Sequence, residues 1–348
     1  MSIDPDIQPF LDTITNRLTE IDKQIVSVIA GMTALTNRVT ALEAGTPPVT
    51  PPVTPPVNSS FPTAESTGVK GVTPVPWTSV FRTSAMIGGS ALINGPSYKV
   101  LEGYVFDHGT NKYLIIDDPY VILRNCKFSI TGTVSNTSAM LQTSGTKSLI
   151  VESCEFNANW NRAIQSDNAD ITVRKSKFKN TGEAAIEKND RNGASSLTIE
   201  GNFLINDKGW PSGQHVDGYQ VGGAKNVTIK NNTILNPCYG GNEGNTGYVS
   251  NSALGLWAEL GNVTGAVVVD GNLMAGGGYT MYLEAKSPYA WKGSVSVTNN
   301  VFDTRYSPKC GVWGPLYPSG LPSNLVWEGN KFSTGATISK ASAMNDYR

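Results

Sequence analysis

VTIKNNTI, at residues 227–234, is the stretch that decides the fold, because seven other stretches of the chain repeat its pattern. The pattern is an apolar residue, any residue, an apolar residue, two polar or turn residues, a small polar residue, any residue and an apolar residue. The other copies are VILRNCKF (121–128), LIVESCEF (149–156), ITVRKSKF (171–178), LTIEGNFL (197–204), VVVDGNLM (267–274), VSVTNNVF (295–302) and LVWEGNKF (325–332). Their first residues lie 22 to 40 positions apart. YKVLEGYVF, from Tyr98, is a candidate for a degenerate first copy.

Each position of this pattern has a physical role. The first and third residues point to the same side of a strand, which predicts a buried face. The fifth is Asn or Gly in six of the eight copies, and both tolerate a left-handed bend at little cost. The eighth is apolar again and is expected to stack inside the core. The sixth is Asn in the last five copies and predicts a ladder of stacked, hydrogen-bonded amides: Asn202, Asn232, Asn272, Asn300 and Asn330.

A repeat of this length with one bent strand per copy indicates a solenoid. A β-propeller blade needs four strands in about 40 residues, and a leucine-rich repeat would carry a helix or its equivalent in every copy. Most of the spacings are too short for the first, and the Leu skeleton of the second is absent. We therefore predict an all-β parallel β-helix over residues 98–335, right-handed because parallel crossovers almost always are.

The sequence of residues 1–45 predicts a coiled-coil helix, whose role would be oligomerisation or anchoring. Apolar residues recur at alternating spacings of four and three, which keeps one seam facing a partner. The a positions are Leu11, Leu18, Ile25, Met32 and Val39, and the d positions are Ile7, Ile14, Ile21, Val28, Leu35 and Leu42. β-branched residues dominate at d, which favours three or four helices over two, so we expect a homotrimer through residues 7–42. The alternative is an amphipathic helix packed on the chain's own body.

We expect residues 46–60 to form a linker. Their proline-rich repeat, TPPVTPPVTPPV (46–57), favours a semi-rigid polyproline II spacer. A PxxP ligand for a recognition domain is the alternative. Residues 61–97 are expected to form the N-terminal cap of the β-helix, and residues 336–348 a C-terminal tail.

Composition excludes several classes of protein. The 27 basic and 28 acidic residues nearly balance, so no bulk charge draws the chain to nucleic acid or to an anionic membrane. We expect no membrane insertion, secretory signal, metal or cofactor. The four cysteines (Cys126, Cys154, Cys238 and Cys310) are too few for a disulfide framework. Cys126 and Cys154 take the ladder position on successive coils, where either stacked thiols or a disulfide would fit.

The repeats resemble the right-handed β-helix proteins of the pectate-lyase-like superfamily, particularly as used in bacteriophage tail fibres, tailspikes and minor tail proteins. The resemblance covers residues 98–335, and the order coiled coil, linker and β-helix is similar to that of a trimeric virion fibre. It implies a location on the virion, with other virion proteins at the N-terminus and a host envelope glycan as partner. The paired aspartates and Gly-His-Gly of polygalacturonase-like hydrolases, and the calcium-and-arginine set of pectate lyases, are absent.

The stretch from Gln214 to Gln220 holds the best candidates for chemistry. It resembles a His-x-Asp-Gly-x-Gln strand of some carbohydrate-active β-helix proteins, which implies His215 and Asp217 as catalytic residues. Alternation along a strand predicts that His215, Asp217 and Tyr219 share one side, opposite Gln220. A histidine beside a carboxylate can act as general acid or base. The alternative is a structural polar rung with a hydrogen-bonded histidine.

Other strands are expected to extend this patch on the same face. Carboxylates and aromatic rings suit sugars, whose C–H faces pack on rings while their hydroxyl groups bond to acids. The glycan-binding candidates are Glu187, Tyr219, Gln220, Trp257, Glu259, Tyr279, Tyr282 and Glu284. GGGYTMY at 276–282 is equally consistent with a backbone turn and two packed tyrosines.

Three functions remain open on this sequence. The first is a trimeric fibre or tail protein that binds a host cell-surface glycan. The second is a glycan depolymerase, either hydrolase or lyase, which would need two carboxylates about 5 to 9 Å apart if it were a glycosidase. The third is a structural appendage or decoration protein without a ligand.

Overall fold

The computed structural model describes residues 61–76, 82–108, 113–130, 139–159, 162–207, 215–237 and 250–345. The chain divides into two units, Met1–Thr54 and Pro55–Arg348, and all the described residues belong to the second. The predicted coiled coil (1–45) and linker (46–60) lie outside the described residues.

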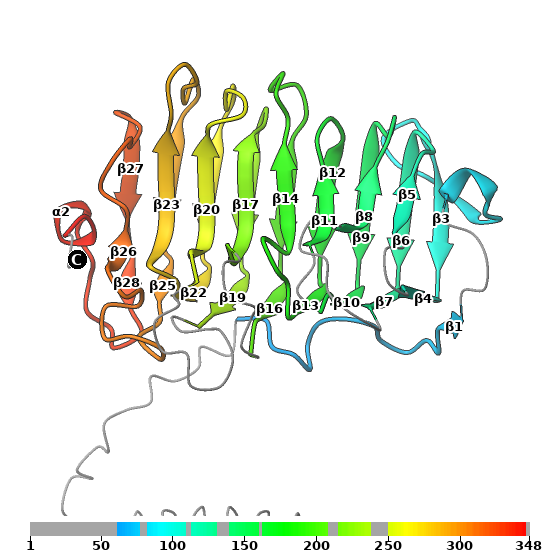
Figure 1. Ribbon diagram of the computed structural model, residues 1–348, viewed down its shortest axis with the longest axis horizontal. Coiled ribbons are helices and arrows are strands. Elements are labelled where there is room, and N and C mark those ends of the chain that lie inside the picture. The colour runs from blue at the N-terminus through cyan, green and yellow to red at the C-terminus, as the bar shows by residue number, and fades with distance from the viewer. Residues whose placement is uncertain are drawn as a thin grey trace, which may run out of the picture. The chain divides into compact units, whose positions relative to one another are not determined.

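The second unit is a stack of coils in which each full coil adds one strand to each of three sheets (Figure 1). All neighbouring strands are parallel except the first pair of one sheet. The prediction of an all-β parallel β-helix is therefore confirmed. Its three sheets are called sheet A, sheet B and sheet C below.

Sheet C holds the first strand of each coil. Its order is β2 (Gly89–Leu92), β3 (Ser97–Glu102), β6 (Tyr120–Arg124), β9 (Ser148–Glu152), β12 (Asp170–Arg174), β15 (Leu197–Glu200), β18 (Val227–Lys230), β21 (Val267–Asp270), β24 (Val295–Thr298) and β27 (Leu325–Glu328). Only β2 runs antiparallel to its neighbour, β3. With the 3₁₀ turn η1 (Thr83–Ala85) it lies over the first coil.

Sheet A holds the second strand of each coil. Its order is β1 (Val75–Pro76), β4 (Tyr104–His108), β7 (Lys127–Ile130), β10 (Glu155–Asn157), β13 (Lys177–Lys179), β16 (Phe203–Ile205), β19 (Thr233–Asn236), β22 (Leu273–Gly276), β25 (Val301–Phe302) and β28 (Lys331–Phe332).

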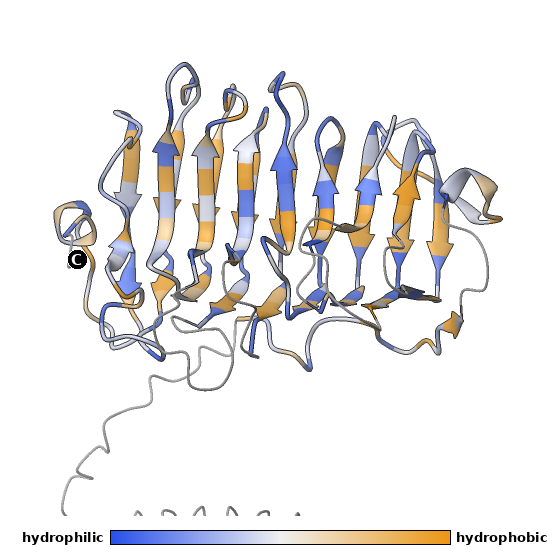
Figure 2. Ribbon diagram, in the orientation of Figure 1, coloured by the Kyte–Doolittle hydropathy of each residue, from blue (hydrophilic) through white to orange (hydrophobic). Residues whose placement is uncertain are grey.

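Sheet B holds the third strand of each coil and faces the viewer in Figure 1. From the first coil onward its strands are β5 (Leu114–Ile116), β8 (Ala139–Thr143), β11 (Arg162–Ser166), β14 (Ile186–Asn189), β17 (Asp217–Gly223), β20 (Ser252–Ala258), β23 (Tyr279–Ala285) and β26 (Gly314–Leu316). Apolar and polar bands alternate along these strands (Figure 2), because one face is buried and the other meets solvent.

Each copy of the sequence pattern spans one strand of sheet C and the next strand of sheet A, and the chain bends at the fifth residue. All eight fifth residues have a left-handed backbone, with φ between 51° and 66°, including Ser153 and Lys175. Lys99 pairs with Val121 and Leu101 with Leu123, and Gly103 has φ 76°. The stretch after Tyr98 is therefore a ninth, degenerate copy.

The sixth position builds a continuous column of buried polar groups. The Oδ1 of Asn232 accepts from the backbone N–H of Asn202 at 2.9 Å and from its Nδ2 at 3.0 Å. The same two bonds repeat down the column to Asn330, and all five asparagines are fully buried. Towards the N-terminus, Ser176 and Cys154 continue it through single bonds.

The eighth position stacks aromatic rings inside the first coils. The centroids of Phe106, Phe128, Phe156 and Phe178 follow one another at 4.5, 4.4 and 4.9 Å, with nearly parallel planes. The thiols of Cys126 and Cys154 are buried and free, so the structure shows stacked thiols rather than a disulfide.

A column of alternating charge runs along the outer face of sheet C at the fourth position. In register it reads Glu102, Arg124, Glu152, Arg174, Glu200, Lys230 and Asp270. Glu152 pairs with Arg124 at 3.1 Å and with Arg174 at 3.0 Å. A slip of one coil would place like charges together, so the column favours the observed pairing of strands.

The two segments flanking the coils pack on them. Phe61 and Ala64 lie on an apolar cluster outside sheet A, formed by Phe203, Leu235, Leu273 and Ala275. Of the segment expected to be a cap (61–97), residues 61–76 thus run along the flank of the coils. At the other end, in the expected tail (336–348), Ile338 is buried beside Trp327 and is followed by the short helix α2 (Lys340–Ala343).

Candidate functional site

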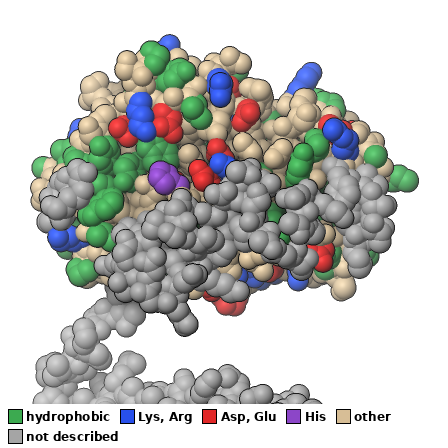
Figure 3. All heavy atoms as spheres, viewed as in Figure 1, with side chains coloured by type: hydrophobic (Ala, Val, Ile, Leu, Met, Phe, Trp, Pro, Cys, Tyr) green, Lys and Arg blue, Asp and Glu red, His purple; other side chains and the backbone are tan. Residues whose placement is uncertain are grey.

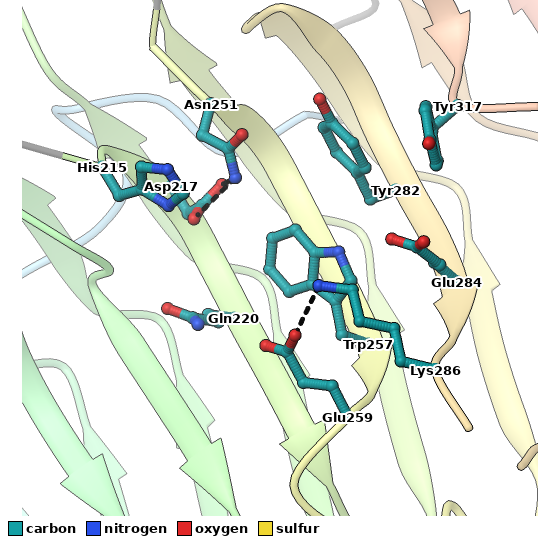
Figure 4. A pocket seen from close by; sticks show the side chains of 10 residues that line it. All are labelled: His215, Asp217, Gln220, Asn251, Trp257, Glu259, Tyr282, Glu284, Lys286 and Tyr317. Atoms are coloured by element: carbon teal, nitrogen blue, oxygen red, sulfur yellow. Dashed lines mark hydrogen bonds and ion pairs between the residues drawn. The ribbon is translucent and has the colours of Figure 1, made fainter. Parts of the chain in front are cut away.

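A groove of about 440 Å³ lies on the outer face of sheet B, over β17, β20 and β23. Its walls combine charged, amide and aromatic side chains (Figure 4). The lining residues are His215, Asp217, Gln220, Asn251, Trp257, Glu259, Tyr282, Glu284, Lys286 and Tyr317. In the space-filling view this face shows a histidine with acidic and basic side chains close by (Figure 3).

The floor of the groove is the indole of Trp257. A Cβ atom on Gly255 would lie 1.9 Å from two ring carbons of this indole, so the ring rests against a position where only glycine fits. Gly255 lies in register between Gln220 on β17 and Tyr282 on β23. Trp257 is 6% exposed, which makes it a floor rather than a projecting platform.

One end of the groove is a cluster of tyrosines. The rings of Tyr282 and Tyr317 have centroids 5.0 Å apart, and that of Tyr282 lies 5.5 Å from Trp257. Both tyrosines are half-buried and expose part of their rings to the groove. Tyr279 is fully buried and packs edge-on against both of them, so it supports the cluster from beneath.

Three charged side chains line the groove beside this cluster. The Nζ of Lys286 donates to Glu259 at 2.6 Å. Burial opposes the charge of Lys286, but the hydrogen bond and charge of Glu259 prevail and raise the pKa of that lysine. Glu284 packs its stem near Gly320 and points into the groove in Figure 4. It forms no hydrogen bond or ion pair with another residue that the structure describes.

Asp217 lies at the other end of the groove and is 1% exposed. Its carboxylate accepts hydrogen bonds from the amide of Asn251, at 3.0 and 3.2 Å, and from the hydroxyl of Ser252. Burial raises the pKa of Asp217 to about 7, although these bonds act in the opposite direction. The carboxyl group therefore holds its proton to a much higher pH than an ordinary aspartic acid does. The exposed side chain of His215 lies beside it.

Seven of the ten predicted site residues come together in this groove: His215, Asp217, Gln220, Trp257, Glu259, Tyr282 and Glu284. The other three do not line it. Tyr219 and Tyr279 are fully buried. Glu187 lies on β14 and pairs with Arg162. Burial raises the pKa of Glu187 against the effect of that arginine.

The predicted alternation of the His215–Gln220 stretch is wrong for Tyr219. Its ring lies in the core, edge-on to Phe178, whereas Gln220 lines the groove. Strict alternation does not hold at the start of β17 (Asp217–Gly223), because Asp217 and Gln220 both line the groove although they are three positions apart. His215 precedes the strand and does not follow its period.

Three residues that line the groove were not predicted from the sequence: Asn251, Lys286 and Tyr317. Lys286 follows Glu284 by two positions, a spacing that could have placed both on the outer face. Tyr317 follows β26, whose Gly-Pro-Leu sequence does not resemble a strand. Asn251 directly precedes β20 and has no distinguishing pattern.

Neither a metal cluster nor a membrane helix is found in the described ranges. They contain no group of three or more His, Cys, Asp or Glu residues arranged to hold a metal ion. No helix there is long and apolar enough to cross a membrane.

Comparison with known protein families gives a match for part of the chain. The family model described as "Right handed beta helix region" matches residues 82–234, less than half of the chain. This match and the parallel sheets together support a β-helix protein of the predicted hand. No curated protein and no solved structure matches the chain.

Proposed function

We propose that the groove on sheet B binds a glycan. The observation that carries the proposal is the combination of half-exposed Tyr282 and Tyr317 rings with carboxylate and amide groups along one groove. Sugars present apolar C–H faces that pack on aromatic rings, and hydroxyl groups that bond to carboxylates and amides. A β-helix region, which families of glycan-binding and glycan-degrading proteins share, is consistent with this proposal.

A glycan array probed with the full chain tests it. We expect binding to a restricted set of glycans, and loss of about tenfold or more in affinity on Tyr282→Ala because a packing ring is removed. The matched control is Tyr120→Ala, which removes a half-buried tyrosine from sheet C. No binding to any glycan, or equal losses in the two variants, would reject the groove as the site.

Cleavage of the glycan is the second candidate function. Asp217 favours it, because a carboxyl group with a pKa of about 7 can donate and accept protons at neutral pH. Its near-complete burial disfavours it. If the protein is a depolymerase, bacterial capsular or O-chain polysaccharides incubated with it should lose length, and Asp217→Asn should abolish the effect. Unchanged polymer size across such a panel would reject cleavage and leave glycan binding as the proposed function.

We further propose that the groove is carried on a homotrimeric virion fibre or tail protein, with residues 7–42 as the trimer seam. The heptad pattern, the proline-rich spacer and the resemblance described above support this. Light scattering on the full chain should give three times the chain mass. Ile21→Asp with Ile25→Asp, both on the seam, should give monomers, whereas Lys23→Asp, off the seam, should not. A monomeric wild-type protein would exclude the fibre.

A further inference from the structure

We infer that the groove on sheet B selects glycans with free amino groups, such as polymers of unacetylated hexosamine, over neutral and uronic-acid glycans. The inference rests on the proposed glycan-binding function and adds the charge class of the ligand.

The first argument is the balance of charge in the groove. Of the lining residues that the structure describes, Glu259 and Glu284 are acids, Lys286 is a lysine and none is an arginine. Buried Asp217 is left out of this balance, because its raised pKa favours the neutral form at the pH of the test below. Lys286 is already bonded to Glu259 at 2.6 Å. An incoming carboxylate would therefore meet a neutralised lysine and further negative charge, which disfavours uronic acids.

The second argument is the setting of Glu284. Its carboxylate projects toward the space bounded by Tyr282, Tyr317 and Lys286 (Figure 4). Within the described part of the chain no cation pairs with it, and Lys286 influences it only at longer range. A half-buried carboxylate without a cation is a site where a positive group from a ligand gains a charge-assisted hydrogen bond.

The third argument is the neighbouring aromatic rings. The faces of tyrosine rings carry partial negative charge and attract cations within about 6 Å of the ring centroid. Tyr282 and Tyr317, with centroids 5.0 Å apart, flank the approach to Glu284. A sugar ammonium there would contact a carboxylate and ring faces together, whereas an acetylated nitrogen would lose both interactions.

Calorimetry with three short oligosaccharides of equal length tests the inference on the full chain. The probes are oligomers of glucosamine, of N-acetylglucosamine and of galacturonic acid, which carry positive, zero and negative charge on similar rings. At about pH 6, where sugar amines are protonated, we expect the glucosamine oligomer to bind about tenfold or more tighter than the acetylated one. The galacturonate oligomer should not bind, and added salt should reduce the preference.

The variant Glu284→Gln keeps the shape of the side chain and removes its charge. It should lower the affinity for the glucosamine oligomer and remove most of its preference over the acetylated oligomer, because the two tyrosine rings remain in place. The matched control is Glu328→Gln, an exposed acid on sheet C, which should leave the affinities unchanged.

These experiments distinguish failure of the charge preference from failure of glycan binding itself. Equal affinity for the charged and the acetylated oligomers, with no effect of Glu284→Gln, overturns the charge preference and leaves glycan binding standing. Binding to glycans on the array without binding to any of the three oligomers would also overturn the charge preference and leave glycan binding standing. No binding on the array overturns both.

Discussion

At the scale of single residues, the bends of the β-helix explain which substitutions its coils tolerate. The fifth position of every copy has a left-handed backbone. That conformation costs a residue with a Cβ atom about 1–2 kcal/mol, and Asn and Gly much less. Ser153 and Lys175 adopt it all the same, with φ 53° and 51°. Their coils carry this strain because the neighbouring strands on either side fix the bend.

Lys175→Asn should therefore stabilise the protein. Lys175 is exposed and its side chain forms no ion pair among those observed in the described coils, so the variant loses little and relieves part of the strain. We expect an increase of about 1 kcal/mol or less in the free energy of unfolding, seen as a higher midpoint in urea. The control is Lys225→Asn, an exposed position without a left-handed backbone. An equal or lower midpoint for Lys175→Asn would show that the bend is unstrained.

Asp217 should make stability depend on pH in a defined window. Its pKa is about 7 in the folded protein against 3.8 for the ordinary group. Between these values the folded state binds more protons than the unfolded state, so stability falls as pH rises, by at most about 1.4 kcal/mol per unit. Urea titrations from pH 4 to 7 should show this slope, and Asp217→Asn should flatten it. A wild-type slope that survives the substitution would assign the effect to other groups.

At the scale of elements, the pattern in the sequence predicted the strands that lie in sheets C and A, because each copy encodes one strand, its bend and the next strand. It did not predict sheet B in the same detail. There the inward residues include Tyr219 and Met281, and the outward row changes from Gln165, Glu187 and Gln220 to Gly255 and Tyr282 along the sheet. The groove lies on this irregular sheet, which is why its lining was only partly foreseen.

A second polar column also escaped prediction. Nδ2 of Asn206 donates to Asn236 at 3.2 Å, and Asn236 donates to backbone carbonyls of residues 216 and 252. Asn206 follows β16 and Asn236 ends β19, at points where loops of variable length begin. A residue that recurs only twice does not stand out as a repeat in a sequence.

Substitution of Asn272 measures how much the main asparagine column contributes to the free energy of unfolding. Asn272→Ala would remove the side-chain partner of the backbone N–H of Asn232 and of the carbonyl of Ile229. Oδ1 of Asn300 would lose one of its two donors and keep the backbone N–H of residue 272. Each buried polar group that loses its partner costs about 1–3 kcal/mol, so a loss of about 2 kcal/mol or more in the free energy of unfolding is expected from urea unfolding. Asn272→Ser should cost less, since Ser176 occupies the same position in its own coil. Asn324→Ala, at an exposed amide, should be nearly neutral; a similar loss there would refute the role of the column.

At the scale of the whole molecule, the strands of each coil pair with those of adjacent coils, while one segment runs along several coils. Residues 61–76 begin beside β19 and β22, where the hydroxyl of Thr233 donates to the carbonyl of Pro62 at 2.6 Å. They pass β12, where the amide of Gly68 donates to Lys175 at 2.9 Å. They end where Val75 pairs with Tyr104. Figure 1 shows this segment as the blue trace along the lower side of the coils.

The anchor of this segment is expected to be Phe61, which packs on the apolar cluster around Phe203 and Leu235. Phe61→Asp would place a charge on that cluster and should release the segment, whereas Lys70→Asp, at an exposed position of the same segment, should not. Hydrogen exchange should then be faster at Gly68 in the first variant alone. The strands of sheets B and C should keep their protection, because a solenoid is stabilised coil by coil. Loss of protection throughout the coils would instead show that the segment holds the whole β-helix together.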